Sequence, residues 1–258
     1  MSADPILATR GLSKHFGGVA AVDDVSIEVA EGTICGLVGP NGSGKTTMLG
    51  CLSRMLPTTA GQMLLEGTDY TRTRRYRLRG MGIARTFQGI RLVKGMSVRD
   101  NVMVGADAGA GLLGRPPWLG GPSTSSRREL VDELLGELDL DTVRELEADT
   151  LPYGVQRRVE IARALATRPR VLLLDEPVAG MNDAEVAEIR DLLLDLRSKG
   201  MTIVLVEHHL DMILAASDHL VVLDFGRCIA AGEPYEVAAR PEVRAAYFGK
   251  EQGVTPRG

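Results

Sequence analysis

Residues 39–46 form the strongest chemical pattern in the chain. They read Gly-Pro-Asn-Gly-Ser-Gly-Lys-Thr and match the phosphate-loop pattern G-x-x-x-x-G-K-[ST] in full. The N–H groups of such a loop converge on phosphate oxygens, and the positive end of the following helix adds to the attraction. We expect Lys45 to reach the β- and γ-phosphates and Thr46 to offer its hydroxyl to Mg²⁺. The predicted triphosphate site consists of Gly39, Pro40, Asn41, Gly42, Ser43, Gly44, Lys45, Thr46 and Thr47.

Two adjacent carboxylates, Asp175 and Glu176, follow the apolar run VLLL at 171–174. Ligands of open α/β sheets bind at the carboxyl ends of parallel strands, so we expect both acids to face the ligand. Asp175 would lie near the metal, directly or through water, and Glu176 would polarise an attacking water as a general base. Helix capping would explain one of these carboxylates but explains the pair less well.

His208 ends the apolar stretch MTIVLVE at 201–207. A single histidine at a strand end is usually structural. Near a γ-phosphate, however, it could hold the attacking water or report hydrolysis. We expect its neighbour, His209, to point elsewhere.

A helix begins in LPYGVQRRVEIARAL at 151–165. If it starts at Gly154, its unpaired N–H groups and its dipole would face an anion. This helix lies in an insert, away in sequence from the chain's own phosphate loop. We therefore expect the anion to belong to another molecule.

The elements around these residues indicate an α/β fold. DDVSIEVAEG alternates as a half-buried antiparallel strand, and TICGLVG is a strand that leads into the phosphate loop and a helix. The strand, helix and strand between 171 and 207 predict a right-handed crossover in a parallel sheet, followed by a hairpin around Phe225 and Gly226. The predicted fold class is a P-loop NTPase-type parallel sheet core with an N-terminal antiparallel β-subdomain and a helical insert.

The helical insert is predicted at about 95–165. It contains a segment rich in glycine, proline and serine, 105–126, which predicts a flexible loop. After this loop, one helical stripe comprises Leu130, Leu134, Leu135 and Leu138. We predict a single domain over 5–253 and a C-terminal tail at 254–258.

The amino-acid composition excludes several classes of function for this chain. The formal net charge is −4 for 258 residues, so no overall attraction to nucleic acid is expected, and the arginines between 72 and 79 predict a solvated helix face. The three cysteines have no metal-ligand spacing and predict buried, structural thiols. No apolar run reaches the length of a membrane span, and the N-terminus lacks the hydrophobic block of a signal peptide. These features predict a cytoplasmic protein without a nucleic-acid partner.

The motifs together resemble a known family. GPNGSGKTT, RTFQ, LPYGVQRRVEIARAL, LLLDEPVAGMN and VEHH occur in the order of the Walker A, Q-loop, signature, Walker B with D-loop, and switch-histidine motifs of ATP-binding-cassette (ABC) ATPases. More narrowly, FGGVAAVDDVS and PEVRAAYFG resemble the ATP-binding subunits of branched-chain amino-acid importers. The resemblance covers nearly the whole chain. It implies an ATPase that couples ATP hydrolysis to uptake of a polar solute, most specifically branched-chain amino acids.

The resemblance also assigns roles to residues. Phe16 matches the aromatic residue that stacks on adenine, where tyrosine is commoner. The implied catalytic residues are Lys45, Gln88, Glu176 and His208, and the implied Mg²⁺ ligands are Thr46, Gln88 and Asp175. The signature residues Pro152, Tyr153 and Gly154 would contact the ATP held by a partner subunit.

The implied partners are a second ABC ATPase, identical or different, two transmembrane permease subunits and, indirectly, an extracytoplasmic solute-binding protein. This places the chain at the cytoplasmic face of the membrane. Two alternatives are a soluble ABC ATPase not linked to transport and a non-hydrolysing regulatory subunit. The single modest insert between Q-loop and signature disfavours the first. Intact Lys45, Asp175, Glu176 and His208 disfavour the second.

The signature departs from the common pattern LSGGQ. Pro152 stands where serine normally gives a hydroxyl to the γ-phosphate, and Asn182 ends the D-loop where aspartate is usual. Proline suits the first turn of a helix, and Gly154 keeps its N–H. We expect Pro152 to weaken the partner's site only modestly.

Overall fold

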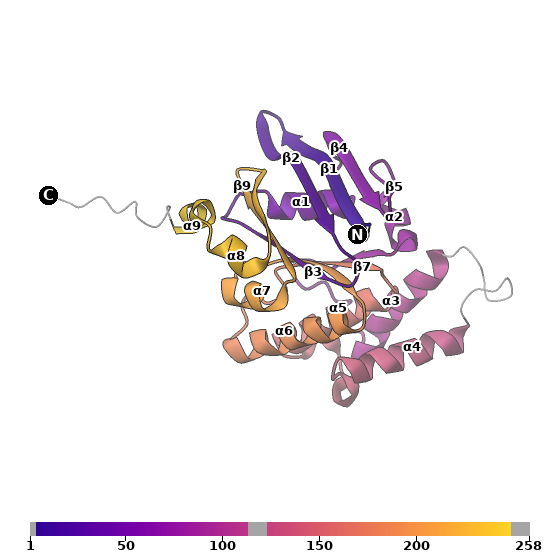
Figure 1. The fold of residues 1–258 in the computed structure, drawn as a ribbon. Helices are drawn as coiled ribbons and strands as arrows, with labels where there is room; N and C mark the ends of the chain where they lie inside the picture. Colours follow the sequence, from indigo (N-terminus) through magenta and orange to yellow (C-terminus); the bar gives the residue numbers. More distant parts are fainter. Residues whose placement is uncertain (1–3, 113–122, 249–258) are drawn as a thin grey trace. The chain divides into compact units, whose positions relative to one another are not determined.

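The structure is a computed structural model that describes residues 4–112 and 123–248. The chain divides into two compact units, and Figure 1 labels most of their helices and strands. The first unit runs to Arg72 and resumes at Val204, and the second comprises Thr73–Ile203. The domain bounds 5–253 and the tail at 254–258 stay predictions, and the tail lies outside the described residues.

The first unit contains an antiparallel sheet with the strand order β2-β1-β4-β5. Val25, Ile27 and Val29 are buried while Ser26 and Glu28 are exposed, which confirms the predicted half-buried strand. The alternation arises because successive side chains of a strand point to opposite faces. The strands of this sheet are β1 (Leu7–Phe16), β2 (Val19–Val29), β4 (Ala60–Leu65) and β5 (Thr68–Asp69).

The second sheet of this unit has β3 (Ile34–Val38) between β8 and β9. β3 is completely buried and runs parallel to β9, and β9 pairs antiparallel with β10. The predicted hairpin around Phe225 and Gly226 is therefore confirmed. The first two residues of β8 (Thr202–Val206) belong to the second unit and the rest to the first. The remaining elements of the first unit are α1 (Lys45–Leu52), α7 (Leu210–Ala216), β9 (His219–Asp224), β10 (Arg227–Gly232), α8 (Pro234–Ala238) and α9 (Pro241–Phe248).

The second unit contains a parallel strand pair, β6 (Ile83–Arg85) and β7 (Val171–Asp175). β7 was expected from its apolar run, whereas β6 was not, because three residues carry no readable periodicity. α6 (Asp183–Ser198) follows β7 and buries Ile189, Leu193 and Leu196, as its helical spacing predicts. Short helical turns precede β6, at α2 (Arg75–Leu78) and η1 (Arg79–Met81).

The helical insert lies between β6 and β7. It comprises α3 (Val98–Leu112), α4 (Thr124–Glu137), η3 (Asp141–Val143), η4 (Ala148–Thr150) and α5 (Tyr153–Leu165). α3 packs against both α4 and α5. Any side chain on Gly105 of α3 would collide with the carbonyl oxygen of Arg163 of α5. The packing of this insert therefore requires a residue without a Cβ.

The predicted loop at 105–126 is wrong at both ends. α3 continues to Leu112 and α4 begins at Thr124, because Val102 and Ala106 are buried in the insert and Ser123 caps α4 by accepting a hydrogen bond from Ser126 N. Residues 113–122 lie outside the described residues. The other predictions of fold class are confirmed: the architecture is α/β, with a parallel sheet core, an N-terminal antiparallel sheet and a helical insert.

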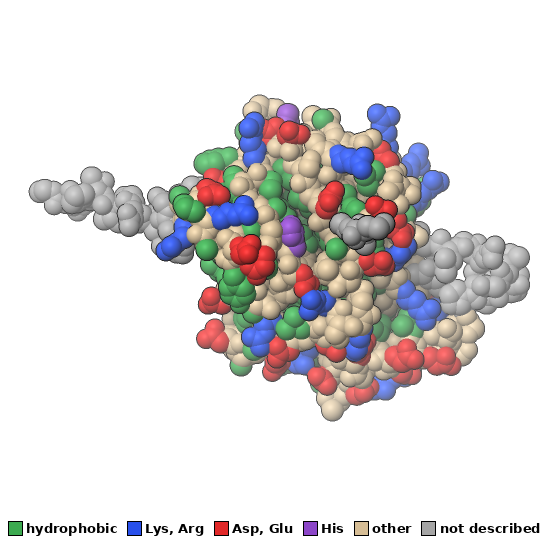
Figure 2. Space-filling view, in the orientation of Figure 1, with side chains coloured by type: hydrophobic (Ala, Val, Ile, Leu, Met, Phe, Trp, Pro, Cys, Tyr) green, Lys and Arg blue, Asp and Glu red, His purple; other side chains and the backbone are tan. Residues whose placement is uncertain are grey.

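The surface carries charges of both signs. Acidic and basic side chains are interspersed on the face shown in Figure 2. All five arginines of the run between 72 and 79 are exposed, as predicted, although only residues 75–78 are α-helical. Within the described residues, no helix is both long and apolar enough to cross a membrane.

Candidate functional site

The phosphate loop connects β3 to α1 in the first unit. Gly39, Gly42 and Gly44 have φ of 148°, 80° and 104°, in the region that favours glycine. A Cβ on Gly39 would collide with the carbonyl oxygen of Leu223, and one on Gly44 with that of Ala21. The loop can follow this path only because these positions are glycines.

Lys45 folds back onto the loop that it ends. Its Nζ donates to the carbonyl oxygens of Gly39 at 2.7 Å and Pro40 at 3.0 Å, and the residue is 5% exposed. No described side chain caps the start of α1, and Thr46 is exposed beside it. A helix end of this kind presents N–H groups to an anion. The ammonium group of Lys45 therefore lies at the loop, within hydrogen-bond distance of the Gly39 and Pro40 carbonyl oxygens.

The β9–β10 turn supports this loop from the side. Gly226 N donates to the carbonyl oxygen of Ser43 at 3.0 Å, and Asp23 N donates to the carbonyl oxygen of Gly226 at 2.8 Å. Arg227 forms an ion pair with Asp23 at 2.7 Å. The sequence predicts the hairpin but not its contact with the loop, since the contact joins positions about 180 residues apart.

Phe16 and His208 also belong to the first unit. Phe16 ends β1 with 48% of its surface exposed, and the ammonium of Lys14 lies 4.8 Å from its ring centroid. The ring is thus available for stacking. His208 is exposed, and its backbone N–H donates to Oε2 of the buried Glu207 at 2.9 Å. His209 is exposed at the start of α7.

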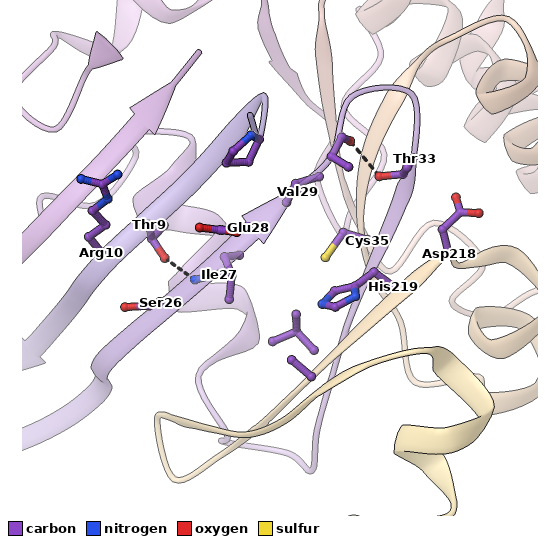
Figure 3. Close-up of a pocket in the computed structure, with 14 residues that line it drawn as sticks. Thr9, Arg10, Ser26, Ile27, Glu28, Val29, Thr33, Cys35, Asp218 and His219 are labelled. Carbon is purple, nitrogen blue, oxygen red and sulfur yellow. Dashed lines mark hydrogen bonds between the residues drawn. The ribbon is translucent and has the colours of Figure 1, made fainter. Parts of the chain in front are cut away.

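A separate cavity of about 620 Å³ opens in the first unit (Figure 3). Most of the residues around it come from β1, β2, β3, β9 and β10, and they include Arg10, Glu28, Cys35 and His219. None of the predicted site residues lines it. Burial raises the pKa of the Cys35 thiol to about 12, and Cys228 adds to the effect. Cys35 is therefore a protonated thiol at neutral pH. Cys35 and Cys51 are buried, as predicted, whereas Cys228 is exposed, so the prediction of a buried thiol is wrong at that position.

Asp175 ends β7 in the second unit and pairs with Arg85 of the parallel strand β6. Arg85 Nη2 lies 2.7 Å from Asp175 Oδ2, and the two side chains are 10% and 3% exposed. The other carboxylate oxygen, Oδ1, is buried and has no hydrogen-bond partner among the described residues. A buried acceptor without a donor suits a hard cation or a water bound to one.

Glu176 follows Asp175 and contacts the Q-loop, which comprises residues 85–88. Gln88 Nε2 donates to Glu176 Oε2 at 2.8 Å. Glu176 has φ of 48°, in the left-handed region that residues other than glycine rarely adopt. Such strain costs about 1–3 kcal/mol and persists where the surroundings fix the residue, often at functional sites. The structure therefore brings two of the predicted catalytic side chains together.

The signature helix is α5, and it begins at Tyr153. Pro152 occupies the cap position with φ of −53° and ψ of 150°, so the expectation of proline within the first turn is wrong by one residue. An extended ψ at this residue cannot start a helix, which sets the boundary. Tyr153 is 40% exposed. A Cβ on Gly154 would lie 3.2 Å from Glu185 Oε1 of α6, so a side chain there would need Glu185 to move.

Asn182, at the end of the D-loop, caps α6. Its Oδ1 accepts hydrogen bonds from Ala184 N at 3.0 Å and Glu185 N at 3.1 Å, and Glu185 Oε2 accepts from Asn182 N at 3.0 Å. This reciprocal arrangement is a capping box. The asparagine that departs from the family pattern therefore has a structural function within the chain.

Arg157 of α5 is a further polar residue near the site that is not among the predicted site residues. It is completely buried, and its Nη1 donates to Glu160 Oε2 at 2.6 Å and to the carbonyl oxygen of Phe87 at 2.8 Å. Its Nη2 donates to the carbonyl oxygen of Gln88 at 3.0 Å and to Tyr153 Oη at 3.1 Å. Burial raises the pKa of Glu160, while the Arg157 charge opposes this shift. The Arg-x-x-Glu spacing within the buried stripe of α5 was the signal that could have revealed the pair.

The predicted site residues thus divide between the units. Phe16, the phosphate loop with Thr46 and Thr47, and His208 belong to the first unit. Gln88, Asp175, Glu176, Pro152, Tyr153 and Gly154 belong to the second.

Comparison with known proteins identifies the class. The profile of the ABC transporter family matches residues 22–179. The chain belongs to this family, and it is an ABC ATPase, which binds and hydrolyses ATP. It is 37% identical to the high-affinity branched-chain amino acid transport ATP-binding protein BraF of Pseudomonas aeruginosa, over 95% of this chain and 98% of that protein.

One further protein and one solved structure are similar to this chain over almost its whole length. The corresponding protein LivG of Salmonella typhimurium is 36% identical over 96% of this chain and 99% of its own length. Among solved structures, the ADP conformation of the ATP-binding cassette MJ1267 has 34% identity and a TM-score of 0.85, over 96% of this chain and 100% of that cassette.

Proposed function

We propose that this chain is the ATP-binding and ATP-hydrolysing subunit of an importer for branched-chain amino acids. The observation that carries the ATP-dependent part is the glycine-constrained phosphate loop, with Lys45 at its end. The full-length similarity to BraF and LivG supports the transported solute. The motifs of the narrower resemblance, at the two ends of the chain, support it as well.

Nucleotide binding begins at the phosphate loop. Lys45 exchanges the carbonyl oxygens of Gly39 and Pro40 for oxygens of the β- and γ-phosphates, which bind an ammonium more strongly because they are charged. The glycines keep the loop backbone close to the phosphates, and the start of α1 contributes its N–H groups. The exposed ring of Phe16 stacks on adenine, and Lys14 lies next to that ring.

Magnesium fits the oxygen donors of the chain. Within the described residues, no group of three or more His, Cys, Asp or Glu side chains could hold a metal. Mg²⁺ commonly binds through one or two protein oxygens together with substrate phosphates. The fitting donors are the Thr46 hydroxyl, the Gln88 side-chain oxygen and Asp175, whose buried Oδ1 lacks a partner. When bound, Mg²⁺ neutralises charge on the phosphates.

Hydrolysis uses Glu176 as the general base. Glu176 accepts the proton of the attacking water, and Gln88 and His208 orient that water. Lys45 and the loop N–H groups stabilise the charge that develops on the transferred phosphoryl group. The hydrogen bond between Gln88 and Glu176 supports a shared role for these two side chains.

A complete catalytic cycle requires a partner cassette, identical or different. The start of α5, with Pro152, Tyr153 and Gly154, contacts the ATP held by that partner. Since Pro152 caps α5 without a hydroxyl, this contact has one hydrogen bond fewer than the common signature provides. Two permease subunits hold the pair at the cytoplasmic face of the membrane, and an extracytoplasmic solute-binding protein delivers the solute. No nucleic acid takes part.

The test is ATP hydrolysis by the complete transporter in liposomes. The chain is assembled with its permease subunits and second cassette, and phosphate release is measured with the solute-binding protein loaded with leucine, loaded with no solute, or loaded with glutamate. We expect stimulation by the leucine-loaded protein that exceeds the other two. Equal rates would refute the branched-chain cargo. Hydrolysis that never responds to permease subunits would favour a soluble ABC ATPase, and ATP binding without turnover would favour a regulatory subunit.

A further inference from the structure

Arg157 joins the start of the signature helix to the Q-loop. One guanidinium nitrogen bonds the carbonyl of Phe87 and the other bonds the carbonyl of Gln88, at 2.8 and 3.0 Å. The second nitrogen also reaches Tyr153 Oη at 3.1 Å. A planar guanidinium holds several acceptors in one fixed geometry, which a lysine ammonium cannot reproduce. The position of residues 87–88 is therefore tied to the first turn of α5.

Stability alone does not explain the buried pair of Arg157 and Glu160. The two side chains are 0% and 2% exposed, so both charges lose their hydration. Replacing such a pair with apolar side chains is often neutral or stabilising. Apolar side chains, however, cannot bond the carbonyl oxygens of Phe87 and Gln88. Beyond packing, Arg157 therefore provides hydrogen bonds to the Q-loop backbone, and Glu160 balances its charge.

Gln88 forms hydrogen bonds through both its backbone and its side chain. Its carbonyl oxygen accepts from Arg157, and its side chain donates to Glu176 at 2.8 Å. A shift of the first turn of α5 therefore moves the Gln88 backbone, and this changes the hydrogen bond at Glu176. Tyr153, which Arg157 also contacts, stands where the common signature has glycine. The contact between Tyr153 and Arg157 gives this chain a direct connection between signature and Q-loop.

We propose that Arg157 is a positioning residue, which couples the hydrogen bond between Gln88 and Glu176 to the position of Tyr153 at the start of α5. This inference rests on the proposed role of Glu176 as the base. The start of α5 is the segment that contacts the partner's ATP in the proposed function. Binding of the partner's ATP at the start of α5 therefore changes, through Arg157, the hydrogen bond between Gln88 and Glu176 in the same chain.

The first test compares Arg157→Lys with Arg158→Lys. Lysine keeps a cation for Glu160 but lacks the planar guanidinium that donates to the carbonyl oxygens of both Phe87 and Gln88. Arg158 is the matched control: it is the next residue of α5, its side chain is 22% exposed, and its pair with Glu188 spans 3.5 Å. We expect Arg157→Lys to lower kcat for Mg-ATP by about 10-fold with KM within about 2-fold, because misplacement slows chemistry more than binding. Arg158→Lys should leave both unchanged.

The second test is a double-mutant cycle with Gln88→Ala. If Arg157 acts through Gln88, Arg157→Lys should cost less than about 2-fold in kcat once the Gln88 side chain is gone. If Arg157 has only a structural role, the kcat losses of the two single variants should multiply in the double variant. Multiplied losses would overturn the coupling even if each single variant is slow.

A third variant excludes damage to the fold. Arg157→Met combined with Glu160→Met removes both buried charges together, so neither is left unpaired. We expect native thermal stability with kcat lowered as in Arg157→Lys. A double variant with wild-type kcat would overturn the proposal. A wild-type chain that binds no Mg-ATP would instead refute the proposed function, whereas an active wild type with equal kcat for Arg157→Lys and Arg158→Lys would refute only the role of Arg157.

Discussion

Gln88 donates a hydrogen bond of 2.8 Å to Glu176, and this pair links the Q-loop to the carboxylate that follows the Walker B strand. Glu176 itself has an uncommon positive φ of 48°. The strain and the hydrogen bond together fix the direction of the carboxylate. A general base benefits from such fixed geometry, since proton transfer requires it to be within hydrogen-bond reach of the water.

Glu176→Gln should bind Mg-ATP normally but hydrolyse it about 10²–10⁴-fold more slowly, because the amide cannot take a proton from water. Filter binding with labelled ATP and phosphate release measure the two properties separately. Glu188→Gln is the matched control, since that acid is on the α6 surface with a side chain 60% exposed. Unchanged turnover in Glu176→Gln would refute the assignment of the base.

Lys45→Ala should lose most of its affinity for ATP. The variant removes the ammonium that lies on the phosphate loop, and charge-assisted hydrogen bonds contribute about 1.5–3 kcal/mol each, or at least about 10-fold in Kd. Lys199→Ala is the control, because Lys199 pairs with Glu137 and Asp195 on the surface of the second unit. ATP affinity equal to that of the wild type in Lys45→Ala would contradict the phosphate-loop assignment.

Pro152→Ser tests the departure in the signature. Serine is a preferred cap residue, so we expect thermal stability to rise slightly, within the range of about 0.5–2 kcal/mol known for caps. ATPase activity of the assembled transporter should change by less than about 3-fold, which is smaller than the rate effect of one hydrogen bond of about 1 kcal/mol. A large gain in coupled activity would show that the missing hydroxyl limits the partner's site.

Stability should fall at alkaline pH because of Cys35. Burial raises the pKa of this thiol from its ordinary 9.0 to about 12. Above pH 9 the unfolded chain releases this proton while the folded chain keeps it, so the free energy of unfolding decreases with rising pH until about 12. Urea unfolding at pH 8, 9 and 10 should show a smaller decrease for Cys35→Ala than for the wild type. Parallel curves would contradict the burial of a protonated thiol.

The sequence was sufficient where chemistry and local pattern coincide. The phosphate loop, β7 with its two acids, and the hairpin at Phe225 and Gly226 were all predicted, because glycine, apolar runs and turn residues act over a few positions. The start of α5 was predicted to within one residue. These features need no knowledge of distant contacts.

Tertiary contacts decided the rest. Residues 105–112 are helical despite their glycines, since Gly105 permits the close approach of α3 to α5. The pair of Arg85 and Asp175 joins residues 90 positions apart, and Arg157 reaches Gln88 across 69. No local pattern encodes such pairings, so the polar contacts around the predicted catalytic side chains became visible only in the structure.

Magnesium-dependent nucleotide binding by the purified chain, together with turnover by the chain assembled with its second cassette and permease subunits, tests the central claim most directly. Labelled ATP binding and phosphate release should be measured side by side for the wild type, Lys45→Ala and Glu176→Gln, with and without Mg²⁺. The account predicts binding and turnover in the wild type, neither in Lys45→Ala, and binding without turnover in Glu176→Gln. A wild-type chain that binds no ATP in the presence of Mg²⁺ would contradict it.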